Sequence, residues 1–211
     1  MLVSGADRGF RSRAHRGYDA APPIGRTEVT QAMSSVLDYL RGRAVPFVVF
    51  PDPEAELPEQ VAERHGLDVD ELVRTEVVSN RFGFALMVVP WDRRLDLTLA
   101  RRAMNDPDAR LATRDELRRK VPEFDPESWP PLGLFLLMPT FVDREVAGRD
   151  QVVFPAGTPG TLVCLQTDEL FGDDPVVITA LTTDTMKREP VGTRRGNLWA
   201  VRPEPEHPAI G

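Results

Sequence analysis

Short apolar runs bounded by proline or glycine recur along this 211-residue chain and limit the folds open to it. The clearest are PFVVFP (46–51), FGFALMVVP (82–90), QVVFP (151–155) and TLVCL (161–165). Runs of this length, rich in β-branched and aromatic residues, predict buried strands. None approaches the ~20 apolar residues that a membrane helix needs, so we expect no membrane span.

Segments with helical spacing lie between these runs. A first helix is predicted from Thr27 or Thr30 to about Gly42, because its apolar residues repeat every three to four positions. Further helices are predicted from Pro58 to Gly66, from near Asp96, and after the capping box Thr113-x-x-Glu116. This mixture of helices, hairpins and crossovers predicts an α/β or α+β fold with a curved mixed β-sheet.

The domain organisation follows from composition along the chain. Residues 1–27 are rich in Gly, Arg, Ala and Pro without an apolar period, which predicts a disordered arm. Residues 28–184 contain all the expected helices and strands and form one domain. Residues 185–211, mostly Pro, Glu, Gly and Arg, are expected to be a C-terminal tail.

Charge and cysteine content exclude several classes of protein. The formal net charge of −7 argues against binding along DNA or other long nucleic acids, since such binding depends on many Lys and Arg contacts to phosphate. It leaves room for contact with one nucleotide end. A single cysteine permits no internal disulfide, and no apolar signal segment follows the N-terminal arginines. We therefore expect a cytoplasmic protein.

Several catalytic motifs are absent from the sequence. There is no G-x-G-x-x-G, no P-loop, no H-E-x-x-H and no G-x-S-x-G, and the histidines at 15, 65 and 207 are scattered. We therefore expect no cofactor and no metal. Cys164 lies in an apolar run, which indicates a buried structural thiol rather than a nucleophile. Asp143 is expected to accept backbone N–H bonds in a corner.

The segment ESWPPLG (127–133) is incompatible with a continuous helix. Two prolines at 130 and 131 fix φ, and Gly133 is free to adopt a positive φ. A rigid turn is therefore predicted at Pro130–Gly133.

The order of these segments resembles the YbaK-type aminoacyl-tRNA editing domains, over about residues 33–183. The stretch LVRTEVV (72–78) is similar to the family pattern V-x-K-T-L-V-V. The stretch VPWDRRLDL (89–97) is similar to V-P-G-D-x-x-L-D-L, and the PPLG turn and VVFPAGTPGTLVCLQTDEL (152–170) follow in the family's order. The resemblance implies a mixed sheet or partly open barrel surrounded by helices.

The resemblance also implies a function: hydrolysis of the ester of a mischarged tRNA by a water molecule, assisted by the substrate's own groups. The acceptor end of aminoacyl-tRNA is the implied partner. The Arg-rich arm and the C-terminal tail extend beyond the minimal domain and are candidates for docking an aminoacyl-tRNA synthetase. Arg74 stands at the family's lysine and is the implied catalytic residue. The implied substrate-binding residues are Thr75, Pro130, Pro131, Gly133, Gly157 and Gly160.

The chain departs from the family at several of these positions. Arg74 keeps the charge of the lysine but cannot act as a base. Glu127 stands where the family loop has glycine, Pro155 where it has serine, and Leu162 where many members have aspartate.

Two hypotheses from different classes remain open. One is an active deacylase with a reshaped pocket, and the other is a degenerate homologue that binds the tRNA 3′ end or a synthetase. For individual residues the alternatives are structural: Arg74 as a solvated charge, Thr75 as a packed β residue, and the prolines as a turn.

Overall fold

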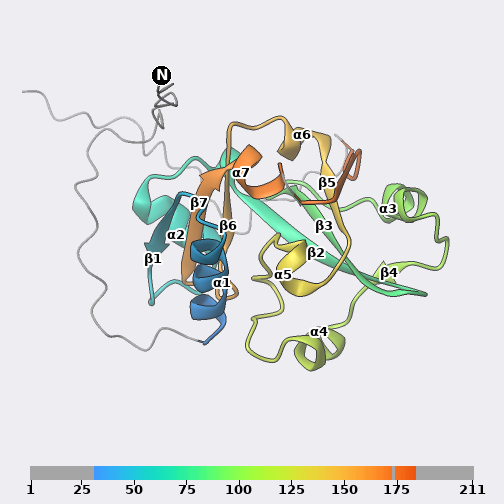
Figure 1. Ribbon diagram of the computed structural model, residues 1–211, viewed down its shortest axis with the longest axis horizontal. Helices are drawn as coiled ribbons and strands as arrows, with labels where there is room; N and C mark the ends of the chain where they lie inside the picture. Colours follow the sequence, from blue (N-terminus) through green and yellow to red (C-terminus); the bar gives the residue numbers. More distant parts are fainter. Residues whose placement is uncertain (1–30, 173, 184–211) are drawn as a thin grey trace, which may run out of the picture.

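The computed structural model describes residues 31–172 and 174–183, which form two β-sheets with helices around them (Figure 1). The three-stranded sheet is antiparallel, with the strand order β1-β7-β6. Its strands are β1 (Phe47–Pro51), β6 (Gln151–Pro155) and β7 (Thr161–Gln166). Each coincides with one of the apolar runs bounded by proline or glycine.

The five-stranded sheet is mixed, with the order β4-β2-β3-β5-β8. Its strands are β2 (Val73–Asn80), β3 (Gly83–Pro90), β4 (Arg110–Leu111), β5 (Thr140–Asp143) and β8 (Val176–Thr179). The hairpin β2–β3 is antiparallel, whereas β3, β5 and β8 run parallel to one another. The expected mixed class is confirmed, and the sheets do not close into a barrel.

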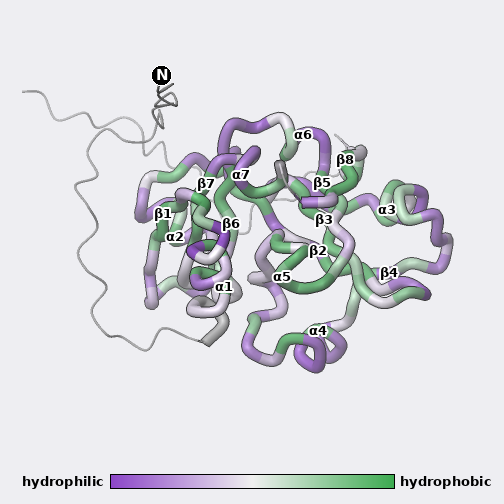
Figure 2. Tube along the Cα trace, in the orientation of Figure 1, coloured by the Kyte–Doolittle hydropathy of each residue, from purple (hydrophilic) through white to green (hydrophobic). Residues whose placement is uncertain are grey.

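A parallel bridge between Leu72 and Val153 joins the two sheets just before β2 begins. The largest hydrophobic cluster of the described residues packs between the two sheets. This cluster takes Val73, Val77, Leu86 and Val88 from the five-stranded sheet and Val152, Phe154, Val163 and Leu165 from the other. In Figure 2 the strands are mainly hydrophobic, whereas α4 on the outside is hydrophilic.

Several helices begin or end at residues that satisfy terminal backbone groups. They are α1 (Gln31–Gly42), α2 (Pro58–His65), α3 (Leu97–Met104), α4 (Arg114–Lys120), α5 (Gly133–Leu136), α6 (Arg144–Ala147) and α7 (Thr167–Phe171), with a 3₁₀ turn, η1, at Val69–Glu71. Gly66 ends α2 in a left-handed conformation, and Asp96 caps α3. The predicted capping box of Thr113 and Glu116 starts α4.

Two local expectations are corrected. The strand expected from Thr75 begins at Val73, so Arg74 and Thr75 lie inside β2 rather than at a junction. The expected rigid turn at Pro130–Gly133 is wrong at its end, because Gly133 opens α5 and does not adopt a positive φ. A Cβ on Gly133 would lie 2.0 Å from Thr140 Oγ1, so close packing rather than turn geometry requires this glycine.

The expected arm (1–27) and the expected tail (185–211) lie outside the described residues. Within the described part of the chain, no helix has the length and apolar character to cross a membrane.

Candidate functional site

The alternation of β2 sends its side chains to two different environments. Val73 and Val77 face the cluster between the sheets, whereas Leu72 and Val78 belong to two other clusters on the opposite face. Because successive strand residues point to opposite faces, Thr75 shares the face of Val73 and Arg74 shares the face of Leu72. Arg74, the implied catalytic residue, and Thr75, an implied substrate-binding residue, therefore leave β2 in opposite directions.

Arg74 is held by two neighbours on its own face of the sheet. Its Nη1 lies 2.8 Å from Glu76 Oε1, and its Nη2 donates a 2.6 Å hydrogen bond to the carbonyl of Arg93. The Arg74 side chain is 13% exposed. Its charge is thus compensated by Glu76, which stands where the family pattern has leucine.

Thr75 lies on the same side of β2 as the diproline segment. Trp129 and Leu132, on either side of Pro130 and Pro131, pack in the cluster that contains Val73 and Val77. Pro130, Pro131 and Gly133 are themselves buried. The structure therefore brings Thr75 and the diproline segment to one core rather than to opposite sides of the molecule.

The loop after β6 is attached to the diproline segment. Gly157 N–H donates to the Ser128 carbonyl at 2.9 Å, and the Gly157 carbonyl accepts from the Asp125 N–H at 2.9 Å. Gly157 has a φ of 84°, which favours glycine. Gly160 is bound on the other side, where its carbonyl accepts from the Asp52 N–H at 2.7 Å. Both loop glycines predicted for the site thus lie in one connected loop region.

Two polar atoms, one in β2 and one in the diproline segment, are buried without a hydrogen-bond partner among the described residues. They are the Thr75 Oγ1 and the Trp129 Nε1, and Trp129 is only 1% exposed. A buried polar atom without a partner costs about 1–3 kcal/mol, so such atoms commonly pair with water or a ligand. Both belong to segments that the sequence resemblance assigns to the substrate site.

Several departures from the family cluster on the Arg74 face of β2. Trp91, where the family pattern has glycine, packs with Leu72 and with Leu162, where many members have aspartate. The Trp91 indole donates a 2.6 Å hydrogen bond to Glu59 Oε1, and its backbone N–H donates to the Leu72 carbonyl. Pro155 pairs with Leu162 across the β6–β7 hairpin. An apolar cluster thus occupies a region that the family pattern makes small and polar.

Glu127, the departure from the family's loop glycine, does not enter this region. Its side chain is exposed and pairs with Arg114. Its backbone N–H donates to Asp125 Oδ1 at 2.8 Å, which shapes the turn. The charge that the sequence places in the loop therefore points to solvent.

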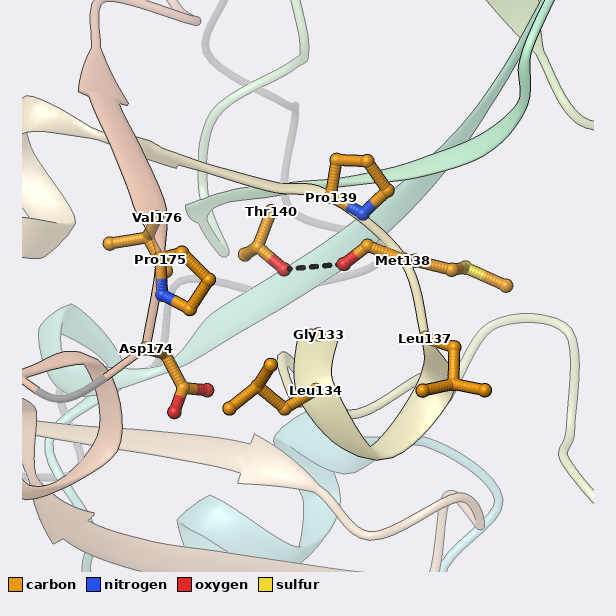
Figure 3. Close-up of a pocket in the computed structure, with 9 residues that line it drawn as sticks. All are labelled: Gly133, Leu134, Leu137, Met138, Pro139, Thr140, Asp174, Pro175 and Val176. Carbon is orange, nitrogen blue, oxygen red and sulfur yellow. Dashed lines mark hydrogen bonds between the residues drawn. The ribbon is translucent and has the colours of Figure 1, made fainter.

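Two hollows lie in the described part of the chain, and neither is lined by Arg74 or Thr75. A polar one of about 520 Å³ is lined by side chains that include Arg93, Glu145 and Arg149. Burial raises the pKa of Glu71 in its wall, where Gln151 donates to the carboxylate at 2.7 Å. A second hollow of about 220 Å³ lies between α5 and β8 and is lined by Gly133 and Thr140 (Figure 3).

Other titratable side chains have structural roles. Burial raises the pKa of the Cys164 thiol to about 12, which confirms a structural thiol. Asp143 Oδ2 accepts backbone N–H bonds from Leu181 and Thr182, as expected. His65 Nε2 lies 3.2 Å from the Pro51 carbonyl. Among the described residues there is no cluster of His, Cys, Asp and Glu that could hold a metal ion.

Sequence reasoning overlooked Glu76, Trp91 and Arg93 as neighbours of the site. Glu76 could have been identified from the sequence, because residues two apart on one strand point to the same face, and Glu76 is two residues from Arg74. Trp91 could also have been identified, because a bulky residue stands there in place of the glycine of the family pattern. Arg93 contributes a backbone carbonyl, which no side-chain pattern marks.

Comparisons with known proteins support the fold. One solved structure, a candidate trans-editing enzyme for prolyl tRNA synthetase, has a TM-score of 0.64 and 25% identity, and the match covers 74% of this chain and 99% of that one. The hypothetical protein APE2540 shares the fold, with a TM-score of 0.63, 21% identity, and coverage of 71% and 99%. No curated protein sequence matches the chain.

The profile of the aminoacyl-tRNA editing domain matches residues 52–172, which is more than half of the chain. This range includes β2, the diproline segment and the loop after β6. The chain therefore belongs to the aminoacyl-tRNA editing domain family.

Proposed function

We propose that this protein is an aminoacyl-tRNA deacylase that acts in trans on the acceptor end of a mischarged tRNA. The observation that carries the proposal is the family match over residues 52–172. The convergence of β2, the diproline segment and the Gly157 loop on one region supports it. The Thr75 hydroxyl and the Trp129 indole N–H, which are buried there without a partner among the described residues, are proposed to donate to the substrate or its water.

The reaction needs little from the protein. A water oxygen forms a bond to the ester carbonyl carbon, and the bond from that carbon to the ribose oxygen then breaks. The ribose oxygen takes one proton of that water, the amino acid leaves as its carboxylate, and the second proton of the water passes to solvent. Orientation of water and fixed donors for the oxyanion lower the barrier without a protein nucleophile. Cys164, with its pKa of about 12, is not a thiolate at neutral pH.

In this proposal Arg74 stabilises negative charge and does not take a proton, because a guanidinium stays protonated in proteins. Arg74 and Thr75 leave opposite faces of β2, so one substrate can meet both only across the strand edge. β4 pairs with β2 only at Val78 and Ser79, which leaves residues 73–76 outside that pairing. The substrate end is therefore proposed to lie across this part of β2.

The test is release of the amino acid from a panel of mischarged tRNAs by the purified full-length protein. Because one structural relative is a candidate trans-editing enzyme for prolyl tRNA synthetase, tRNA for proline carrying a non-cognate amino acid is the first substrate to assay. Arg74→Ala should slow release at least tenfold. Arg81→Ala, an exposed arginine at the far end of the same hairpin, is the matched control. No release above buffer from any substrate would exclude the deacylase.

A second function, binding without hydrolysis, is favoured by the apolar contact of Trp91 with Leu162 and by the Arg74–Glu76 ion pair. Trp91 and Leu162 fill a region that is small and polar in the family pattern, and Glu76 compensates the charge of Arg74. Such a protein would retain or protect the charged 3′ end, or bind a synthetase.

A binding assay separates the two functions. The binding protein should hold a non-hydrolysable aminoacyl-tRNA analogue and lengthen the lifetime of the natural ester. The deacylase should shorten that lifetime. A gel shift that is insensitive to Arg74→Ala would remove Arg74 from either site.

A further inference from the structure

Exposed apolar side chains gather on α5 and β8 of the described structure. Of eight large apolar residues that are exposed, four lie on α5 and its end or on β8: Leu134, Leu137, Val177 and Ile178. Leu137 is 88% exposed and has a positive φ of 53°, which is costly for a leucine. Contiguous exposed apolar surface of this kind usually marks an interaction site.

The hollow of about 220 Å³ lies between these two elements (Figure 3). Leu134 and Leu137 line it from α5, and Pro175 and Val176 line it from the start of β8. Its volume is below the ~300–1,000 Å³ of typical small-molecule sites, so it suits a single large side chain rather than a cofactor.

A free strand edge borders the hollow. β8 is the last strand of its sheet, and among the described residues it pairs only with β5. Its residues, Val176 to Thr179, carry no charge that would discourage pairing with another strand. An incoming extended segment can therefore hydrogen-bond to β8 and place one side chain in the hollow.

The end of the described chain lies close to this edge. Leu181 and Thr182, just beyond β8, are bound to Asp143 at the end of β5. The 28 residues that follow, 184–211, lie outside the described part. Their sequence contains one apolar run, Leu198-Trp199-Ala200-Val201. The 13 residues 184–196 can span about 40 Å, which exceeds the ~13 Å length of β8.

Charge also favours this occupant. Arg194 and Arg195 come just before the apolar run. On the receiving side, α7 exposes Asp168 and Glu169. Asp174, which lines the hollow, is already paired with Arg43 at 2.9 Å. The basic pair can therefore lie near acidic side chains when the apolar run reaches β8.

We propose that residues 198–201 of the same chain bind along the free edge of β8 and place Trp199 in the hollow between α5 and β8. The segment returns antiparallel to β8, since the chain leaves from the carboxyl end of that strand. This contact covers Ile178, Leu134 and Leu137. The hollow shares Gly133 with the candidate substrate site, but Ile178, Leu134 and Leu137 are not among the residues implied for deacylation, so the two proposals can fail separately.

Disulfide trapping in the full-length protein tests the contact. Ile178→Cys is combined in turn with cysteines at positions 198, 199, 200 and 201, and Phe82→Cys replaces Ile178→Cys in the matched control. Phe82 is 83% exposed at the β2–β3 turn, and the native Cys164 is buried in every variant. We expect at least one Ile178→Cys pair to form an intramolecular disulfide tenfold faster than its control. Rates equal to the control, or disulfides found only in dimers, would overturn the proposal.

Hydrogen exchange supplies a second readout that needs no new covalent bond. Trp199→Ser should raise the exchange rate of β8 amides at least tenfold and leave α1 amides unchanged. Unchanged exchange in β8 would count against the contact, whatever the deacylase assay shows.

Discussion

Arg74 and Glu76, two residues apart on one face of β2, form an ion pair with 2.8 Å between Nη1 and Oε1. If Arg74 stabilises charge on the substrate, Glu76 competes with that substrate for the guanidinium. Glu76→Gln should therefore raise kcat/KM about twofold to fivefold, the effect of ~0.5–1 kcal/mol. Deacylation kinetics measure the change, with the exposed Glu63→Gln as control. A lower rate in Glu76→Gln would mean that the ion pair is needed rather than inhibitory.

Trp91 is expected to stabilise the fold through its bond to Glu59. Trp91→Phe removes the donor and leaves Glu59 Oε1 without it, which should cost about 1–3 kcal/mol in the free energy of unfolding. The double variant Trp91→Phe/Glu59→Leu should recover most of this loss, because both polar partners are then replaced. Urea unfolding measures both. Equal stability of the single variant and the wild type would contradict the role of the bond.

Gly133 is expected to tolerate no side chain. In Gly133→Ala the new Cβ would meet Thr140 Oγ1 at 2.0 Å and the Met138 carbonyl at 2.8 Å. We expect a loss of about 1–3 kcal/mol in stability, as overpacking usually gives. Gly42→Ala, at the end of α1 with open space around the Cβ, should be neutral or slightly stabilising in the same unfolding experiment.

Cys164 is expected to be inert in the folded protein. Its thiol is buried, and a pKa of about 12 leaves almost no thiolate at pH 8. Iodoacetamide at pH 8 should label Cys164 only after unfolding, as mass spectrometry can show. Cys164→Ala should keep deacylation within twofold of the wild type. A loss of activity without a loss of structure would reopen the question of a thiol nucleophile.

Glu116 should make stability depend on pH in the acid range. Its hydrogen bonds from Arg110, then from the Thr113 N–H, lower its pKa from 4.5 to about 2. A lowered pKa in the folded state stabilises it above pH 4.5, and this stabilisation is lost as the pH falls towards 2. Glu116→Gln should therefore show a shallower loss of stability between pH 4.5 and 2. Identical acid profiles in thermal unfolding would contradict the pKa.

Much of the local structure could be predicted because its causes are local. The apolar run FVVFP forms β1, Pro58 and Gly66 bound the expected α2, and Thr113 with Glu116 caps α4. The patterns around Arg74-Thr75 and Pro130–Gly133 also indicated the editing family, which the match over residues 52–172 supports. These features depend on residue types and spacings that the sequence displays directly.

The arrangement of the candidate site was decided by packing over long sequence separations. Strand alternation places the side chains of Arg74 and Thr75 on opposite faces of β2. The hydrogen bond between Gly157 and Ser128 joins two loops and cannot be predicted from the spacing of residues in the sequence. Gly133 is required by its distance to Thr140, not by a turn, and Trp91 meets Leu162 only after both sheets have formed. Propensity and capping act within a few residues, whereas the contacts that shape a site join chain segments whose approach is set by the whole core.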